Sequence, residues 1–410
     1  MLYHYNKYGV LPVTTNSLAK PFLVVLLCCL IIRSAALAQG PIQAVPGASG
    51  NSLDPNPNQR APYPRLVRIL HGEQRDGIVA SVSPGVFYES RDDGRTFQEI
   101  GAIPSVEGIT PKCCGTLFEA PRQVGSLSEG TLLYAGSYCG GSDGKTASIE
   151  IFASIDDGRT WTHHSTPVQR GSCVSAENDG LWEPEFEVDE EGALVMFWSD
   201  ETDPCCSQKL AQMRSLDGTT WGDEQNTVAS KVRTDRPGMA TVSRLPSGIY
   251  FMSYELCGPA ACTVFYRTSY DGWTFGVPSD TGQKIQTLSG EFFEHAPTNR
   301  WDAGFHQGEG ALLLVGQYLM TSGGANAPNT GRVLFVNTSR DASGEWKAIP
   351  APVHVDMTPY LGKANYNNCA NYSSALLPVE RGSALLELAT APSSLSTCGA
   401  YYDKELLGER

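Results

Sequence analysis

Long apolar runs are scarce in this sequence, and the one at residues 22–32 is the most pronounced. It is shorter than the roughly 20 residues that a membrane-spanning helix needs. Lys7 and Lys20 precede it, and Ala36-Leu37-Ala38 follows it as a small-x-small cleavage signal. We therefore predict a signal peptide over residues 1–38 and a secreted, extracellular chain with no membrane association after its removal. Because the stretch before the run is long, a retained anchor is the alternative.

Clusters of positive charge are also missing. The chain has 30 lysines and arginines against 44 aspartates and glutamates, which gives a net charge of −14. Nucleic acids and anionic membrane surfaces both favour grouped basic side chains, so we expect neither as a partner. An uncharged polymer such as a polysaccharide is compatible with this charge. The sequence has no phosphate-binding loop or nucleotide fingerprint, so we expect no cofactor. We also expect a monomer.

Cys-x-x-Cys and paired histidine spacings are absent, which argues against a metal site. Of the 12 cysteines, Cys28 and Cys29 lie in the predicted leader. The even number that remains predicts disulfides in a secreted chain. Cys257 and Cys262 are close enough in sequence for a local bridge, whereas the other pairings cannot be deduced. These other cysteines are Cys113, Cys114, Cys139, Cys173, Cys205, Cys206, Cys369 and Cys398.

Two further features describe the exterior of the chain. Residues 39–59 are rich in glycine, proline, asparagine and serine without periodicity, which predicts a flexible segment. Asn337-Thr338-Ser339 and Asn371-Tyr372-Ser373 match the acceptor pattern for N-glycosylation, which predicts a glycoprotein.

The stretch at residues 181–201 organises the rest of the sequence. It combines a short strand opened by Glu183-Pro184, a turn at Gly192 and a more apolar strand over residues 193–198. The same unit occurs six times, and its turn glycines are 53 to 72 residues apart. These glycines are Gly77, Gly130, Gly192, Gly248, Gly310 and Gly382.

A second motif follows most of the units. Its clearest copy is Ser154-Ile155-Asp156-Asp157-Gly158-Arg159-Thr160-Trp161. Serine and aspartate side chains can accept from turn amides, glycine can take the left-handed conformation, and the aromatic residue can pack beneath the sheet. This is the Asp-box pattern, also called the bacterial neuraminidase (BNR) repeat, and we expect it to serve structure. Further copies lie at residues 90–97, 215–221 and 269–275, with a degenerate one at 339–346.

Repeats of this length, built from short strands and turns, predict a β-propeller. Six units predict an all-β, six-bladed β-propeller of the sialidase superfamily that occupies residues 60–410 as a single domain. A β-sandwich gives no reason for six equivalent units, and a parallel β-helix needs a shorter period.

Acidic residues recur near the opening proline of the units. In a propeller, equivalent positions of the innermost strands form a ring, so these residues should gather at one mouth. Like charges repel, which makes such a ring a poor choice for stability and a candidate glycosidase site. The residues that we assign to this ring are Tyr63, Glu119, Glu183, Asp235, Arg236, Glu294 and His295.

Two glutamates are the leading catalytic candidates. Glu183 lies between Trp182 and Pro184, where an apolar wall could raise its pKa toward general-acid duty. The alternative for Glu183 is a solvated acid at a strand edge. Glu255 ends an apolar strand, where an unpaired carboxylate is costly to bury. A salt bridge with Arg236 or Arg267 is the alternative to a role as nucleophile.

The Asp boxes, the six units, and the motifs Leu181-Trp182-Glu183-Pro184 and Ser253-Tyr254-Glu255 resemble the secreted fungal exo-arabinanase family of sialidase-like propellers. That resemblance implies a retaining glycoside hydrolase that cleaves plant cell-wall α-1,5-L-arabinan from the non-reducing end. It also implies that Glu183 and Glu255 are the catalytic pair, with Glu255 as nucleophile and Glu183 as acid/base.

Two alternatives come from the same superfamily. A sialidase uses a tyrosine nucleophile and an arginine triad. Arg236, Arg267 and Arg332 make a partial triad, with Tyr366 or Tyr372 as the tyrosine, although the Arg-Ile-Pro motif is absent from the first unit. A non-catalytic carbohydrate-binding propeller is the other alternative.

Supporting residues complete the predicted site. We assign substrate binding to Arg236, Trp182, Tyr254 and Tyr366, and to the mouth acids Glu119 and Asp235. Arg236 can orient a carboxylate or a sugar hydroxyl, and Tyr254 can donate to the neighbouring Glu255. A structural ion pair for Arg236 and core packing for Tyr254 are the alternatives. The predicted partner is a polysaccharide or oligosaccharide, and no metal is needed.

Overall fold

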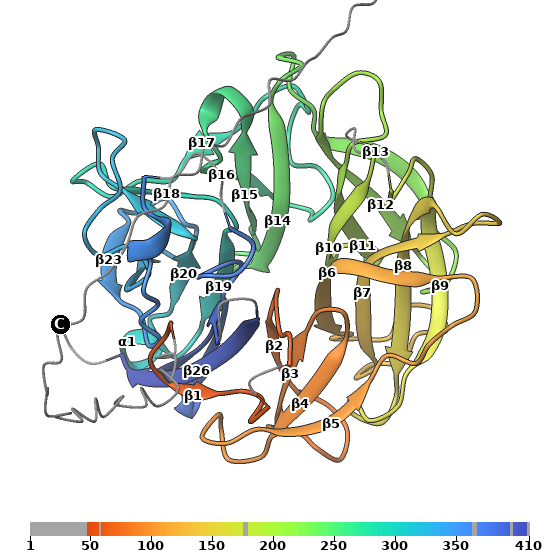
Figure 1. The fold of residues 1–410 in the computed structure, drawn as a ribbon, viewed down its shortest axis with the longest axis horizontal. Helices are drawn as coiled ribbons and strands as arrows, with labels where there is room; N and C mark the ends of the chain where they lie inside the picture. The colour runs from red at the N-terminus through yellow and green to blue at the C-terminus, as the bar shows by residue number, and fades with distance from the viewer. Residues whose placement is uncertain (1–46, 57–58, 175–178, 363–366, 394–396, 408–410) are drawn as a thin grey trace, which may run out of the picture. The chain divides into compact units, whose positions relative to one another are not determined.

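Strands make up nearly all the regular structure of this chain. The computed structural model describes residues 47–56, 59–174, 179–362, 367–393 and 397–407. These residues form six antiparallel sheets arranged as the blades of a propeller, which confirms the predicted fold class. Figure 1 looks along the axis that the blades surround. The predicted leader lies outside the described residues. Among those described, no helix is long and apolar enough to span a bilayer.

The first three blades each have four strands in sequence order. The first comprises β2 (Arg65–Arg68), β3 (Ile78–Val82), β4 (Val86–Ser90) and β5 (Gln98–Ala102). The second comprises β6 (Thr110–Glu119), β7 (Leu132–Gly140), β8 (Thr146–Ser154) and β9 (Thr162–Gln169). The third comprises β10 (Leu181–Val188), β11 (Leu194–Asp200), β12 (Lys209–Ser215) and β13 (Gly222–Val228).

The last three blades depart from this simple order. The fourth contains β14 (Arg236–Arg244), β15 (Tyr250–Cys257), β16 (Thr263–Ser269), β17 (Gln283–Lys284), β18 (Phe292–Glu294) and β21 (Tyr318–Met320). The fifth contains β19 (Thr298–Asp302), β20 (Ala311–Val315), β22 (Val333–Asn337) and β23 (Lys347–Pro350). The sixth contains β24 (Ala375–Val379), β25 (Ala384–Pro392), β26 (Cys398–Leu406) and β1 (Asn51–Ser52).

Helical structure among the described residues is limited to four short segments. They are α1 (Phe305–Gly308) and the 3-10 turns η1 (Gly258–Ala260), η2 (Thr358–Tyr360) and η3 (Glu380–Gly382).

The sixth blade closes the ring with strands from both ends of the described chain. Strand β1 pairs with β26, where Asn51 lies opposite Tyr402. Residues 51–52 of the predicted flexible segment therefore belong to a sheet. The division into leader, flexible segment and propeller at residues 38 and 59 otherwise stays a prediction.

The innermost strands form a closed ring around the axis. Each of β2, β6, β10, β14, β19 and β24 contacts the innermost strand of both neighbouring blades. We call the end at which these six strands begin the mouth, and the opposite end the far face. Large aromatic side chains between the blades are fully buried, including those of Tyr88, Tyr134, Trp198 and Phe251. Burial of such rings is a major source of the stability of the ring of blades.

The turns between the third and fourth strands have the hydrogen bonds that the Asp-box pattern predicts. In the second blade the Ser154 hydroxyl donates to Asp156 Oδ1 at 2.8 Å. The amide of Gly158 donates to Ser154 Oγ at 2.9 Å, and Gly158 has a φ of 88°, which glycine adopts without strain. Trp161 then stacks on Phe87 of the first blade, with ring centres 4.2 Å apart. These turns lie at the far face.

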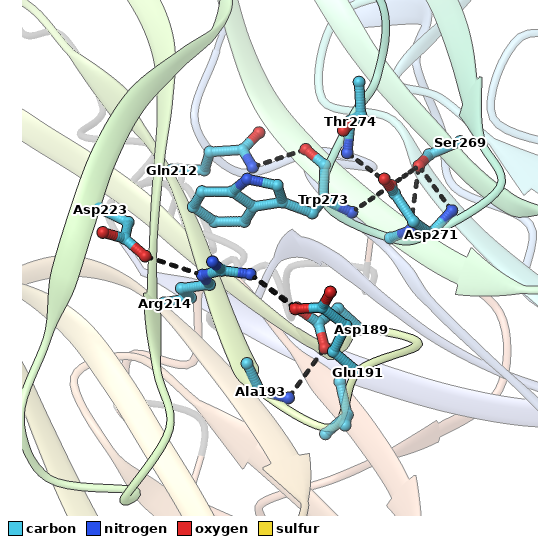
Figure 2. A network of polar contacts seen from close by, with 12 residues as sticks. Asp189, Glu191, Ala193, Gln212, Arg214, Asp223, Ser269, Asp271, Trp273 and Thr274 are labelled. Atoms are coloured by element: carbon cyan, nitrogen blue, oxygen red, sulfur yellow. Dashed lines mark hydrogen bonds and ion pairs between the residues drawn. The ribbon is translucent and has the colours of Figure 1, made fainter.

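Figure 2 shows the corresponding turn of the fourth blade and its link to the third. Asp271 Oδ1 accepts from the amides of Trp273 (2.9 Å) and Thr274 (2.6 Å). The carbonyl of Trp273 accepts from the side-chain amide of Gln212 on β12 at 2.8 Å. The guanidinium of Arg214, also on β12, lies 4.8 Å from the centre of the Trp273 indole. The turn therefore joins adjacent blades as well as shaping its own.

Every cysteine that follows the predicted leader is paired in a disulfide. The predicted Cys257–Cys262 bridge is confirmed. The other four are Cys113–Cys114, Cys139–Cys173, Cys205–Cys206 and Cys369–Cys398, of which two join adjacent residues.

Both predicted glycosylation asparagines are buried. Asn337 is 0 % exposed and Asn371 is 4 % exposed. The side-chain amide of Asn337 donates to the carbonyls of Ala342 and Gly344, and that of Asn371 donates to Gly316 and Gln317. The folded chain therefore gives no support to modification at these nitrogens, and glycosylation stays a prediction.

Candidate active site

The mouth is built from one irregular residue in each blade. Within the first five residues of each innermost strand, or just before it, a residue other than glycine has a positive φ, a conformation that L-residues rarely adopt. Where the strand is long enough, this residue forms a bulge, as between Trp182 and Glu185 in β10. Bulges re-aim side chains, which here turn toward the mouth. The six residues are Tyr63, Cys114, Glu183, Met239, Ala296 and Ser373.

Glu183 is held at this ring by two donors on one oxygen. The hydroxyl of Ser199, on β11, donates to Glu183 Oε2 at 2.7 Å. The backbone amide of Met239, from the ring position of the next blade, donates to the same oxygen at 3.2 Å. Because both donors converge on Oε2, the proton of the neutral carboxyl belongs on Oε1.

Burial, and after it the nearby charge of Glu255, raise the pKa of Glu183 to about 7. The hydrogen bonds from Ser199 and Met239 oppose this shift because they favour the carboxylate. Glu183 is therefore poised to be protonated or ionised near neutral pH, as an acid/base catalyst must be.

Glu255 approaches the same place from the second strand of the fourth blade. It lies opposite Gly238 across the β14–β15 pair, and it is 6 % exposed. Its Oε2 accepts from the backbone amide of Ala296 at 2.8 Å. His295 Nε2 lies 3.7 Å from the same oxygen. A backbone donor and a nearby imidazole can stabilise the carboxylate form.

Gly238 separates the two glutamates. A Cβ added there would lie 3.6 Å from Glu183 Oε2 and 2.5 Å from Gln208 Nε2. A side chain at Gly238 would therefore displace Gln208 and crowd the carboxyl of Glu183.

The side chain of Gln317 fixes the orientation of His295. Its Nδ1 lies 2.6 Å from Gln317 Oε1. The side-chain nitrogen of Gln317 donates to the carbonyls of Asn367 (2.7 Å) and Ala370 (2.8 Å), so its oxygen must face the imidazole. Nδ1 of His295 therefore carries a proton, and Nε2 is the atom directed at Glu255.

Trp182 and Arg236 lie near the mouth but are tied to a third acid. Glu201 Oε2 accepts from the indole nitrogen of Trp182 at 2.8 Å. Glu201 Oε1 is bonded to the guanidinium of Arg236, which also donates to Gln208 Oε1 at 2.7 Å. This arrangement is the structural ion pair that the sequence left as an alternative for Arg236. Trp182 is only partly buried, so its ring remains available to a ligand.

Three of the proposed binding residues lie elsewhere. Glu119 ends β6 at the far face, where it accepts from the amides of Leu70 and His71. In this blade the residue with the positive φ near the strand start is Cys114. Glu119-Ala120-Pro121 resembles Glu183-Pro184 in sequence, but it stands at the end of its strand and not at the start. The ring hydroxyl of Tyr254 donates to Thr281 O inside the fourth blade, where Tyr254 is 0 % exposed.

Asp235 precedes the ring position of its blade by four residues. Its Oδ2 accepts from the hydroxyl of Ser230 at 2.6 Å, which closes the loop that leads into β14. Glu119, Tyr254 and Asp235 are therefore corrected to structural roles. Tyr366 lies outside the described residues, and its predicted binding role is untested.

Sequence reasoning missed Ser199 and gave Tyr372 only the sialidase role. Ser199 follows the apolar run of β11 at the end that faces Glu183, a small polar residue in a place where the pattern favours an apolar one. Tyr372 precedes the ring position of the sixth blade, and its ring centre lies 5.4 Å from that of His295. Burial and the two glutamates raise the pKa of Tyr372 well above its usual value.

The arginines of the sialidase alternative do not converge. Arg236 is paired with Glu201, whereas the guanidinium of Arg267 donates to the carbonyl of Thr227, on β13 of the third blade, and to that of Val277. Arg332 is an exposed residue of the loop that follows β21. The described residues thus give the sialidase reading no support.

A metal-like grouping occurs beside the pair. Ligand atoms of Glu255, Cys262 and His295 lie within 4.8 Å of one another. Cys262 is bonded to Cys257 and cannot supply the thiolate that a soft metal prefers. These residues therefore fit a metal ion poorly, and the absence of a cofactor stays a prediction.

Neither protein-family models nor curated protein sequences gave a match to this chain. Solved structures do match. An α-L-arabinanase from Penicillium chrysogenum, solved with arabinobiose, is 26 % identical with a TM-score of 0.68, over 88 % of this chain and 97 % of that one. An α-L-arabinofuranosidase from Fusarium graminearum, solved with an iminosugar inhibitor, is 22 % identical with a TM-score of 0.68, over 88 % and 98 % of the two chains.

A GH93 α-L-arabinofuranosidase from Fusarium graminearum with arabinobiose is 21 % identical, again with a TM-score of 0.68 over 88 % of this chain and 98 % of that one. The resemblance to the exo-arabinanase family inferred from the sequence is confirmed by these neighbours. The two structures below 25 % identity support the shared fold alone.

Proposed function

We propose that this chain is a glycoside hydrolase that cleaves arabinan from a chain end. The observation that carries the proposal is the pair Glu183 and Glu255 at the propeller mouth, where Gly238 lies opposite Glu255 across the strand pair and close to the carboxyl of Glu183. Two carboxyls with different surroundings are what glycoside hydrolysis requires. The 26 % identical neighbour is an arabinanase solved with arabinobiose, which supports an arabinose-containing substrate.

The proposed mechanism is double displacement with retention. Glu183 donates its Oε1 proton to the leaving oxygen while Glu255 attacks the anomeric carbon and forms a glycosyl ester. Glu183, now ionised, then takes a proton from water, which attacks the same carbon and releases Glu255. The pKa of Glu183 near 7 suits both steps, because the group must give and take the same proton.

We also propose that the enzyme is secreted. The five disulfides, which pair every cysteine after the predicted leader, support this address because disulfides persist in oxidising compartments.

The test is product release from linear α-1,5-arabinan, with sialyl-lactose as a parallel substrate. We expect the wild type to release arabinose or a short arabino-oligosaccharide, and Glu255→Gln to lower kcat by about 10³-fold or more, as loss of a nucleophile does. Glu191→Gln, an exposed acid at the far face, is the control and should keep full activity. Binding of arabinan without cleavage would instead favour a carbohydrate-binding propeller.

A further inference from the structure

A cavity of about 320 Å³ opens at the mouth, and a disulfide between two adjacent cysteines forms part of its lining. Its lining includes the Cys113–Cys114 disulfide, the rings of Tyr63 and Tyr372, and the exposed polar residues Lys112 and Asn368. Mostly apolar walls with a few polar groups at the rim are typical of small-ligand sites.

Tyr372 lies between this cavity and the residues that hold the glutamate pair. The ring of Tyr372 lies 5.9 Å from that of Tyr63 and 5.4 Å from that of His295, between centres. Its hydroxyl lies 3.7 Å from the sulfur of Met239, whose amide donates to Glu183. One side of Tyr372 therefore faces the cavity and the other faces the residues that hold the two carboxyls.

The disulfide occupies the place in its blade that Glu183 occupies in the next. Cys114 is the ring residue of the second blade, and it is buried against Tyr63, Met239 and Ala296. The amides of Met239 and Ala296 hold Glu183 and Glu255, respectively. The sulfurs thus belong to the same small apolar cluster that positions both acids.

The backbone at Gly115, next to the disulfide, is held in place by its neighbours. Gly115 donates its amide to the hydroxyl of Ser83 at 3.0 Å. A Cβ added at Gly115 would lie 2.0 Å from the hydroxyl oxygen of Tyr134, so the chain is pressed against that buried ring. The bond between adjacent cysteines then presents two fixed sulfurs, which are polarizable and apolar, to the cavity.

We infer that the Cys113–Cys114 disulfide is a wall of the substrate site, against which the apolar face of an arabinose ring of the substrate packs. The inference rests on the proposed function, because arabinose is chosen as the ligand from the reaction that we propose. Lys112 and Asn368 at the rim can donate to the hydroxyls on the edge of that ring.

The chain contains its own control. Cys205–Cys206 also joins adjacent residues, but it lies in the loop between β11 and β12, Cys205 is exposed, and neither residue lines this cavity. Loss of either disulfide removes the same covalent feature, and only loss of Cys113–Cys114 alters the cavity.

The experiment measures binding of α-1,5-arabinotriose by calorimetry to the full chain carrying Glu255→Gln, so that the sugar is not consumed. Adding Cys113→Ala with Cys114→Ala should weaken binding about 10-fold, which corresponds to about 1.4 kcal/mol. Adding Cys205→Ala with Cys206→Ala should leave the Kd within about 2-fold. Equal Kd values for the two double variants would overturn the inference.

A second variant tests the cavity without removing a disulfide. Asn368 is exposed, so Asn368→Trp should fold and fill the cavity from its rim. We expect at least about a 10-fold loss of arabinotriose affinity with an unchanged Tm. Unchanged affinity in this variant would likewise exclude the cavity as part of the sugar site.

Hydrolysis by the wild type is measured separately. Suppose that the wild type cleaves arabinan but the Kd for arabinotriose does not change when Cys113–Cys114 or Asn368 is altered. The disulfide is then not part of the sugar site, and the proposed function stands. If arabinotriose binds through the wall but no arabinan is cleaved, the proposed function fails and the wall stands. If arabinotriose does not bind at all, the wall is overturned.

Discussion

At the scale of single residues, the two central glutamates differ in their donors. Glu183 accepts from a hydroxyl and a backbone amide on the same oxygen, whereas Glu255 accepts from the amide of Ala296 and faces His295. Burial and the neighbouring carboxylate set the pKa of Glu183 near 7. This difference is why we assign the proton to Glu183 and the attacking carboxylate to Glu255.

The Ser199 hydroxyl lowers the pKa of Glu183 because it stabilises the carboxylate. Ser199→Ala should therefore raise that pKa and move the alkaline limb of the kcat/KM profile to higher pH, by about 0.5 to 1 unit for one lost hydrogen bond. Ser207→Ala removes a hydroxyl that donates to Asp235 O and should leave the limb in place. A limb that does not move in Ser199→Ala would show that Glu183 is not the titrating acid.

Some residues of the site could be predicted from the sequence and others could not. Glu183 stands out because it lies between tryptophan and proline at a strand start and belongs to a motif that resembles a known family. Ser199 and Ala296 act through a short hydroxyl and a backbone amide, which leave no chemical mark in a sequence. Tyr254 adjoins Glu255 in sequence, but neighbouring strand residues point to opposite faces, so it packs into the core.

At the scale of elements, turns stabilise one end of the blades and bulges shape the other. Asp-box turns tie adjacent blades together at the far face, as Asp271 and Trp273 do in Figure 2. Bulges with positive φ shape the mouth. The proposed chemistry therefore lies at the end where strand geometry is irregular, and the repeats that are visible in the sequence stabilise the other end.

Removal of an Asp-box carboxylate should affect stability without affecting chemistry. Asp271 accepts from two backbone amides, so Asp271→Ala leaves these donors without their partner and should cost about 1–3 kcal/mol of unfolding free energy. Its kcat should match the wild type. Chemical denaturation and arabinan turnover give both values.

Glu191→Ala is the matched control, because Glu191 is also drawn in Figure 2 and makes one exposed ion pair with Arg214. Such pairs contribute at most about 1 kcal/mol. Equal destabilisation by the two substitutions would contradict the role given to the Asp-box turn.

The sequence predicted the elements that repeat and missed those that do not. The six turn glycines and the four clear Asp boxes mark the blades because each must repeat the same backbone geometry. The short strands β17, β18 and β21 join the fourth blade from insertions that follow no period. Strand β1 lies in a segment whose composition indicates a flexible chain, but it pairs with β26 in the structure.

At the scale of the whole molecule, the ring of blades buries several acids whose pKa values are raised. Burial raises the pKa of Glu183 and of Glu187 to about 7, and that of Glu387 to about 8. In the unfolded chain each ionises near its ordinary value of about 4.3. Between the unfolded and folded pKa values the native state binds more protons, so stability falls as pH rises through this window.

Thermal unfolding should report this loss. We expect a Tm at about pH 5 that exceeds the Tm at about pH 8.5 by about 5 °C or more. Glu387→Gln should reduce this difference, because Glu387 is 1 % exposed and its amide replacement can still accept from Val353. A Tm that rises with pH over this range would contradict the assignment of buried protons.

The central claim is that the mouth hydrolyses arabinan through a covalent intermediate on Glu255. Proton NMR during the first minutes of linear α-1,5-arabinan cleavage tests it most directly, because it reports the anomer that is released before mutarotation. Double displacement predicts an α-configured reducing end as the first product from the wild type, and no product signal from Glu255→Gln. A β-configured first product would contradict the mechanism, and the same turnover in Glu255→Gln would contradict the site.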